Sequence, residues 1–136
     1  SIPLAEKKED FIIPHDISIP LTNISDFVKK TTKSIKEFTN GSKIINFGHL
    51  GDNNLHFNVL IEKQQNLSRK LMCKSVNKIV FDNVKIFGGV ISAEHGIGQL
   101  RKAELQRHKK VFELNKMREI KKIFDPENIL NPGKVF

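Results

Sequence analysis

A short turn-forming segment with the sequence Gly-Asp-Asn-Asn, residues 51–54, constrains the fold more than any other feature, because an apolar-rich run flanks it on each side. The two runs cover residues 43–49 and 55–61. Asp and Asn favour tight turns, since their side chains hydrogen-bond nearby backbone and Asn tolerates a left-handed conformation. The pattern predicts a β-hairpin centred on residues 52 and 53. In that register His49 lies opposite His56.

The other apolar patterns predict the elements on either side of this hairpin. Residues 11–19 are rich in β-branched side chains and contain a proline, which is typical of an edge strand. Apolar residues recur at helical spacing over residues 24–38 and 67–84, and residues 90–92 predict a short buried strand. The resulting order, β-α-β-β-α-β, is the ferredoxin-like pattern. We therefore expect an α+β fold, with an antiparallel sheet covered on one face by two helices.

Further helices are expected after this unit. Residues 100–124 have a helical pattern with a break near His108, and Asp125-Pro126 ends it. The chain has 136 residues and ten Phe, enough for one compact domain with a modest core. The single cysteine excludes an intramolecular disulfide, and the apolar runs are too short to span a membrane. An intracellular protein is the expectation.

The net charge of +8 raises the question of nucleic-acid binding. The lysines are scattered along the chain, however, and they form no dense block. There is also no arginine-rich arm or RNA-binding aromatic motif. The charge pattern therefore favours a protein that does not bind nucleic acid.

Three imidazoles and the Glu94 carboxylate lie among glycines, in residues 48–58 and 88–98, in a chain with only five histidines. Opposed residues on antiparallel strands have Cβ atoms about 4.5–5.5 Å apart, a separation that lets His49 and His56 hold one divalent cation. Glu94 is the candidate for a third ligand, because two histidines and a glutamate form a known catalytic zinc set with an open position. Other divalent metals fit the same ligands.

Two neighbours of these residues are candidates for substrate chemistry. Asn58 projects on the same strand face as His56, so its amide can reach a ligand beside the metal. His95 follows Glu94 directly and can accept a proton from a hydroxyl that the metal polarises. By contrast, we interpret His15 and His108 as structural, because neither has a partner nearby in the sequence.

These segments resemble the C-terminal domain of FAD-linked oxidases, flavoenzymes of the vanillyl-alcohol oxidase superfamily. The resemblance rests on Gly-His-x-Gly-Asp-x-Asn-Leu-His-x-Asn at 48–58, on Gly-Gly-x-Ile-Ser-x-Glu-His-Gly-Ile-Gly at 88–98, and on the segment from Asp-Pro to Asn-Pro-Gly-Lys at 125–134. The segment His-Asp-Ile-Ser-Ile-Pro at 15–20 is similar to the family's first cap-domain strand. The similarity covers residues 1–136 as a single C-terminal domain and is nearest to the branch of D-lactate, glycolate and D-2-hydroxyglutarate dehydrogenases.

The resemblance implies a function and residue roles. In this family FAD is bound mainly by a separate N-terminal domain, and a divalent metal, zinc or manganese, binds a small 2-hydroxy acid. The positions that match the metal ligands are His49, His56 and Glu94. His95 matches the base that takes the hydroxyl proton while hydride passes to FAD, Asn58 matches a substrate-contacting residue, and Asn131 matches a position near the flavin ring.

The chain also departs from the family pattern. Pro14 stands where many relatives have a lysine that helps to hold the substrate carboxylate, and Ala93 replaces a usual glycine beside Glu94. The 136 residues contain no FAD-binding domain, so we expect a fragment or one product of a split gene, inactive in isolation and prone to self-association through uncovered apolar surface. We expect a cytoplasmic protein, placed peripherally on the inner membrane if its electron acceptor is there.

Three classes of function therefore compete. The first is the substrate- and metal-binding cap domain of an FAD-dependent 2-hydroxy-acid dehydrogenase, the reading we favour. The second is an inactive or regulatory metal-binding remnant of such an enzyme. The third is a basic nucleic-acid binder, which predicts a steep loss of binding with salt.

Overall fold

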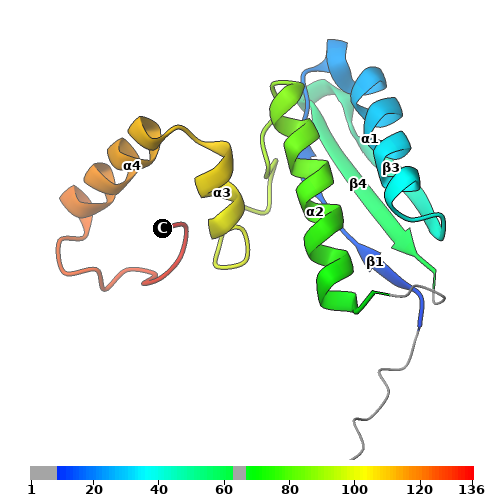
Figure 1. The fold of residues 1–136 in the computed structure, drawn as a ribbon. Helices are drawn as coiled ribbons and strands as arrows, with labels where there is room; N and C mark the ends of the chain where they lie inside the picture. Colours follow the sequence, from blue (N-terminus) through cyan, green and yellow to red (C-terminus); the bar gives the residue numbers. More distant parts are fainter. Residues whose placement is uncertain (1–8, 63–66) are drawn as a thin grey trace, which may run out of the picture.

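The computed structural model describes residues 9–62 and 67–136, and it contains an antiparallel sheet with α1 and α2 on one face (Figure 1). The strands are β1 (Phe11–Ile13), β2 (Asp16–Ser18), β3 (Ser42–His49) and β4 (Asn54–Ile61). The helices are α1 (Ile24–Phe38), α2 (Arg69–Ile86), α3 (Lys102–His108) and α4 (Val111–Phe124), with short 3-10 turns at Leu21–Asn23 and Leu50–Asp52. The predicted α+β class is confirmed, and so is the predicted order of elements as far as α2.

β1 and β2 are two halves of one interrupted strand. Both pair with β4 in the same antiparallel register, and the carbonyl of His15 between them accepts a hydrogen bond of 2.9 Å from the Phe57 N–H. The interruption falls at Pro14, which has no N–H to donate. On its other side, within residues 9–62 and 67–136, this strand forms a β-bridge only between Ser18 and Val90. The short strand expected at 90–92 is thus reduced to one bridging residue. The spatial order is Val90, β1–β2, β4, β3, which is the ferredoxin-like arrangement.

The register of the hairpin differs from the prediction. Phe47 lies opposite His56 and His49 lies opposite Asn54, so the prediction that His49 opposes His56 is wrong. The turn begins earlier than expected, with a 3-10 turn at Leu50–Asp52 followed by Asn53 at φ 60°. The displacement is two residues, an even number, and His49 therefore stays on the same sheet face as His56.

The core lies between the sheet and the two long helices. Alternate β4 residues from Leu55 to Ile61 are buried on the helix-covered side, where Phe27 of α1 meets Phe57 edge to face at 5.5 Å. We call the opposite side of the sheet the open face. It carries His56 and Asn58 and leaves apolar side chains about half exposed: Ile12 51%, Ile45 46% and Phe47 56%. The sheet therefore presents a mixed polar and apolar surface away from its own helices.

α3 and α4 lie beside this layered unit rather than on it (Figure 1). The predicted break is confirmed, because α3 ends at His108 and α4 begins at Val111, where the Glu113 carboxylate accepts the Lys110 N–H. Large apolar side chains of α4 remain exposed, namely Val111, Phe112, Ile120, Ile123 and Phe124. Among the described residues, none of the helices has both the length and the apolar composition needed to cross a bilayer.

His15 occupies a structural place, as the sequence indicated. Its side chain points into the core, 1% exposed, with Nδ1 at 2.8 Å from the Phe57 carbonyl oxygen and Nε2 at 2.9 Å from the Asn77 side-chain oxygen. The ring also meets Phe81 edge to face at 5.4 Å. Desolvation by burial lowers the pKa of His15 to about 4. The folded protein therefore keeps this imidazole neutral at physiological pH.

We expect this histidine to make the protein less stable in mild acid. Below pH ~6.5 the unfolded chain binds a proton at His15, whereas the folded protein does so only near pH 4. The free energy of unfolding should then fall by roughly 3 kcal/mol over that interval, at about 1.4 kcal/mol per pH unit. Urea titrations across this range measure the slope. His15→Gln should flatten it, and equal slopes in both proteins would contradict the assignment.

Candidate active site

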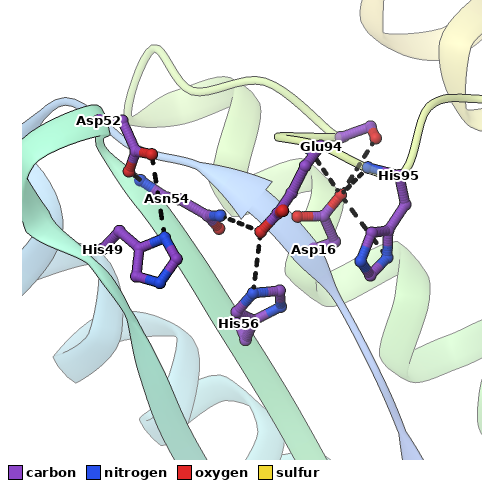
Figure 2. Close-up of polar contacts among 8 residues, drawn as sticks. Asp16, His49, Asp52, Asn54, His56, Glu94 and His95 are labelled. Atoms are coloured by element: carbon purple, nitrogen blue, oxygen red, sulfur yellow. Dashed lines mark hydrogen bonds and ion pairs between the residues drawn. The ribbon is translucent and has the colours of Figure 1, made fainter.

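A carboxylate from the loop after Val90 reaches across to the open face of β4 (Figure 2). One Glu94 oxygen lies 3.3 Å from Nε2 of His56 and accepts a hydrogen bond from the Asn54 side-chain amide. His56 is only 20% exposed, because Phe47 stacks on its ring at 4.9 Å. The two predicted ligands His56 and Glu94 are thus brought together from separate parts of the chain, with Asn54 as an additional partner.

Asp16 holds this loop in place from the neighbouring strand. Its Oδ2 accepts hydrogen bonds from the backbone N–H of Glu94 at 3.0 Å, from that of His95 at 2.8 Å, and from the Ser92 hydroxyl at 3.2 Å. Burial alone would raise the pKa of Asp16, but the two backbone N–H groups hold it below its usual range. Asp16 is therefore an ionised carboxylate that fixes the backbone on which Glu94 and His95 are mounted.

Asp16 is a site residue that the sequence patterns did not predict. A signal was present, since this carboxylate follows a run rich in β-branched side chains, and in the structure it lies directly opposite His56. Its side chain is 9% exposed, and its Oδ1 is buried with no hydrogen-bond partner among the described residues. A buried acceptor of this kind points toward a group that it can bind in the site.

His95 lies at the edge of the same cluster. Its Nδ1 is 3.9 Å from Oδ2 of Asp16, and its ring centroid is 5.9 Å from that of His56. Ligand atoms of Asp16, Glu94 and His95 lie within 4.8 Å of one another. The side chain is 71% exposed, so a reactant can approach it from solvent or from a covering domain.

Two predicted site residues lie further from this cluster. His49, at the end of β3, is 74% exposed, and its Nδ1 is 3.9 Å from the Asp52 carboxylate (Figure 2). Asn131 lies in the tail after α4 at φ 47°, where its carbonyl accepts the Lys134 N–H. None of the described hydrogen bonds or ion pairs joins either residue to Glu94. Asn58 is half-buried on the open face, two residues along β4 from His56.

The donor set fits a divalent metal. Two ligands of a tetrahedral zinc ion, each about 2.0–2.1 Å from the metal, lie roughly 3.3 Å apart. The His56 nitrogen and the Glu94 oxygen are 3.3 Å apart. Imidazole and carboxylate ligands suit zinc and manganese alike. A pocket beside these groups is lined by Asp16, His56 and His95, and by Arg101 from the start of α3.

Comparison with known proteins identifies the family. The model for the C-terminal domain of FAD-linked oxidases matches residues 2–135. The chain belongs to this family. Relatives of this C-terminal domain include a D-2-hydroxyglutarate dehydrogenase of Stutzerimonas stutzeri, 36% identical over 90% of the chain and 26% of the relative. A D-lactate dehydrogenase of Archaeoglobus fulgidus is 38% identical over 88% of the chain and 26% of the relative.

A third relative is a glycolate oxidase subunit of Bacillus subtilis, 32% identical over 98% of the chain and 27% of its own length. The chain thus spans about a quarter of the length of these relatives. The family resemblance inferred from the motifs is confirmed, and so is the nearness to 2-hydroxy-acid dehydrogenases.

Proposed function

We propose that the chain is the substrate- and metal-binding domain of an FAD-dependent 2-hydroxy-acid dehydrogenase. The observation that supports this most strongly is the approach of Glu94 to His56 on the open face, with His95 as the next residue of the same loop. The names of the relatives supply the reaction class, since each of the three names a 2-hydroxy acid: D-2-hydroxyglutarate, D-lactate or glycolate.

The metal is proposed to bind His56 and Glu94 first, with His49 as the third ligand. His49 shares the open face with His56, and its exposed imidazole is free to turn from Asp52 toward the metal. When bound, the metal would polarise the substrate hydroxyl, and FAD would take up a hydride from the adjacent carbon. Asp16 keeps Glu94 in reach by holding the loop backbone.

His95 is proposed as the base of the reaction. When the 2-hydroxy acid is oxidised to a 2-oxo acid, an imidazole nitrogen of His95 would take up the hydroxyl proton. The carboxylate of Asp16 beside Nδ1 stabilises the positive charge that His95 gains. The Asn58 amide, on the same strand face as His56, is proposed to hydrogen-bond the substrate.

The exposed apolar surface fits contact with a further domain or subunit. Phe47 and Ile45 on the open face, and the apolar side chains of α4, are left exposed by the described residues. The chain spans about a quarter of its relatives' length, so a larger part of such an enzyme remains to cover them. We propose that an FAD-binding domain or subunit does so and excludes water from the site.

Reconstitution tests the proposal. The chain, joined to the FAD-binding domain of its own protein or a relative, should bleach the flavin anaerobically with D-lactate, glycolate or D-2-hydroxyglutarate. Elemental mass spectrometry should find about one zinc or manganese ion per chain, bound through protein ligands. Bound metal and bound FAD without turnover of any 2-hydroxy acid would contradict the proposal and favour the inactive metal-binding remnant.

A further inference from the structure

We propose that Arg101 binds the carboxylate group next to the reacting carbon of the 2-hydroxy acid. The inference deepens the proposed function and rests on it. Arg101 lines the same pocket as Asp16, His56 and His95, although it is the N-cap residue of α3 and lies outside the two histidine-containing segments, 48–58 and 88–98. The sequence patterns did not predict it as a site residue.

Contacts on two sides hold the guanidinium at the pocket wall. One terminal nitrogen donates a hydrogen bond of 3.2 Å to the carbonyl oxygen of Pro14. The guanidinium carbon lies 4.9 Å from the centre of the Phe81 ring, and Arg101 is half-buried. These two contacts fix the orientation of the guanidinium and leave most of its N–H donors without a partner among the described residues. The free donors are suited to a planar carboxylate, which an arginine fork can bind through two parallel hydrogen bonds.

The other groups around the pocket are not suited to bind the substrate carboxylate. Burial keeps His15 neutral, with a pKa of about 4. Pro14 contributes a backbone carbonyl that Arg101 already binds. The His56 ring faces Glu94, and His95 is proposed to receive the hydroxyl proton. Arg101 is therefore the one permanent cation among the described residues that line this pocket.

Acidic neighbours do not cancel this charge. Asp16 and Glu104 are the carboxylates that act on Arg101 electrostatically. Neither carboxylate forms an ion pair with Arg101 among the described residues: Oδ2 of Asp16 accepts three hydrogen bonds from the 92–95 loop, and its Oδ1 has no hydrogen-bond partner. Burial lowers the pKa of Arg101, but an arginine stays charged throughout the physiological range.

Substrate size connects the cation with the base. In a 2-hydroxy acid the carboxylate carbon is bonded directly to the carbon that loses hydride. A group that holds this carboxylate must therefore share one small pocket with the group that takes the hydroxyl proton. Arg101 and His95 share such a pocket.

The test uses Arg101→Gln in the chain assembled with its FAD-binding domain. Loss of the charge-assisted pair should raise KM for D-lactate and for D-2-hydroxyglutarate by a similar factor, roughly 10- to 100-fold, with kcat changed far less. The KM of Arg101→Lys should lie between those of the wild type and Arg101→Gln, because lysine keeps the charge but not the planar guanidinium. Arg107→Gln is the matched control, since Arg107 pairs with Asp82 of α2 outside the pocket.

A second readout does not depend on turnover. Calorimetric titration with oxalate, an unreactive dicarboxylate, should show a 10- to 100-fold weaker Kd for Arg101→Gln than for Arg107→Gln. Melting temperatures of all variants identify any loss of folding, and Arg101→Lys keeps the test valid if Arg101→Gln is unstable. An unchanged KM and oxalate Kd, or a rise confined to D-2-hydroxyglutarate, would overturn the inference.

The two proposals fail in different ways. If the wild type oxidises 2-hydroxy acids and Arg101→Gln matches it, the proposed function stands and the role of Arg101 is wrong. If no 2-hydroxy acid is oxidised but oxalate binding depends on Arg101, the pocket binds carboxylates and the proposed reaction is wrong.

Discussion

Replacing Glu94 by glutamine is expected to weaken zinc or manganese binding by more than about 100-fold. Losing a residue that merely orients a metal ligand already costs about 10- to 100-fold in affinity, and Glu94 is proposed to be a ligand itself. Glutamine keeps the shape of the side chain and can still accept the Asn54 hydrogen bond, so the loop should stay folded. What changes is the negative charge 3.3 Å from His56.

Metal titration with a competing chelator measures this effect, and elemental mass spectrometry of the purified variant checks it. Glu37→Gln is the matched control, because Glu37 is an exposed residue of α1 that pairs only weakly with Lys33. Circular dichroism should show both variants folded. An unchanged metal Kd in Glu94→Gln, beside the same value in the control, would remove Glu94 from the ligand set.

Replacing His95 by glutamine is expected to lower kcat by roughly 10²- to 10⁴-fold, the usual contribution of a positioned general base. Metal affinity and oxalate binding should change little, because the proposed role of His95 is to take a proton rather than to bind either ligand. Glutamine retains the backbone N–H that Asp16 accepts, so the loop geometry is preserved. Anaerobic single-turnover bleaching of the flavin in the assembled enzyme measures the chemical step directly.

His108→Gln serves as the matched histidine control. His108 contacts the Gly89 carbonyl at 3.1 Å and lies outside the lining of the pocket. Its rate of flavin bleaching should stay within a few-fold of the wild type. A His95→Gln enzyme that bleaches its flavin as fast as this control would show that another group takes the hydroxyl proton.

The elements of the fold were predictable because apolar periodicity is a local property of the sequence. The ends of α1 and the break between α3 and α4 follow from it directly. The hairpin register did not follow, because the centre of the turn depends on how Leu50–Asp52 coils and on Asn53 taking a left-handed conformation. Asp52 stabilises that turn by accepting the Asn54 N–H, and this places Asn54 in the strand rather than in the turn.

Site residues were predictable only where several of them lie within one short segment of the sequence. Glu94 and His56 were found because each lies among glycines and other polar groups. Asp16 and Arg101 were not predictable because their contacts are long-range: Asp16 binds the backbone of a residue 78 positions away, and Arg101 binds a carbonyl 87 positions away. Such pairs are created by the packing of the sheet against the 91–101 segment, which no local pattern encodes.

The interruption between β1 and β2 hinders the addition of a strand from another copy of the chain. An unpaired strand edge is a template on which another strand can add, and such addition leads to aggregates. Here Pro14 offers no N–H, its carbonyl is occupied by Arg101, and Val90 covers the edge at Ser18. An incoming strand therefore meets no continuous ladder of donors and acceptors along β1–β2, and this edge is closed to the growth of an intermolecular sheet.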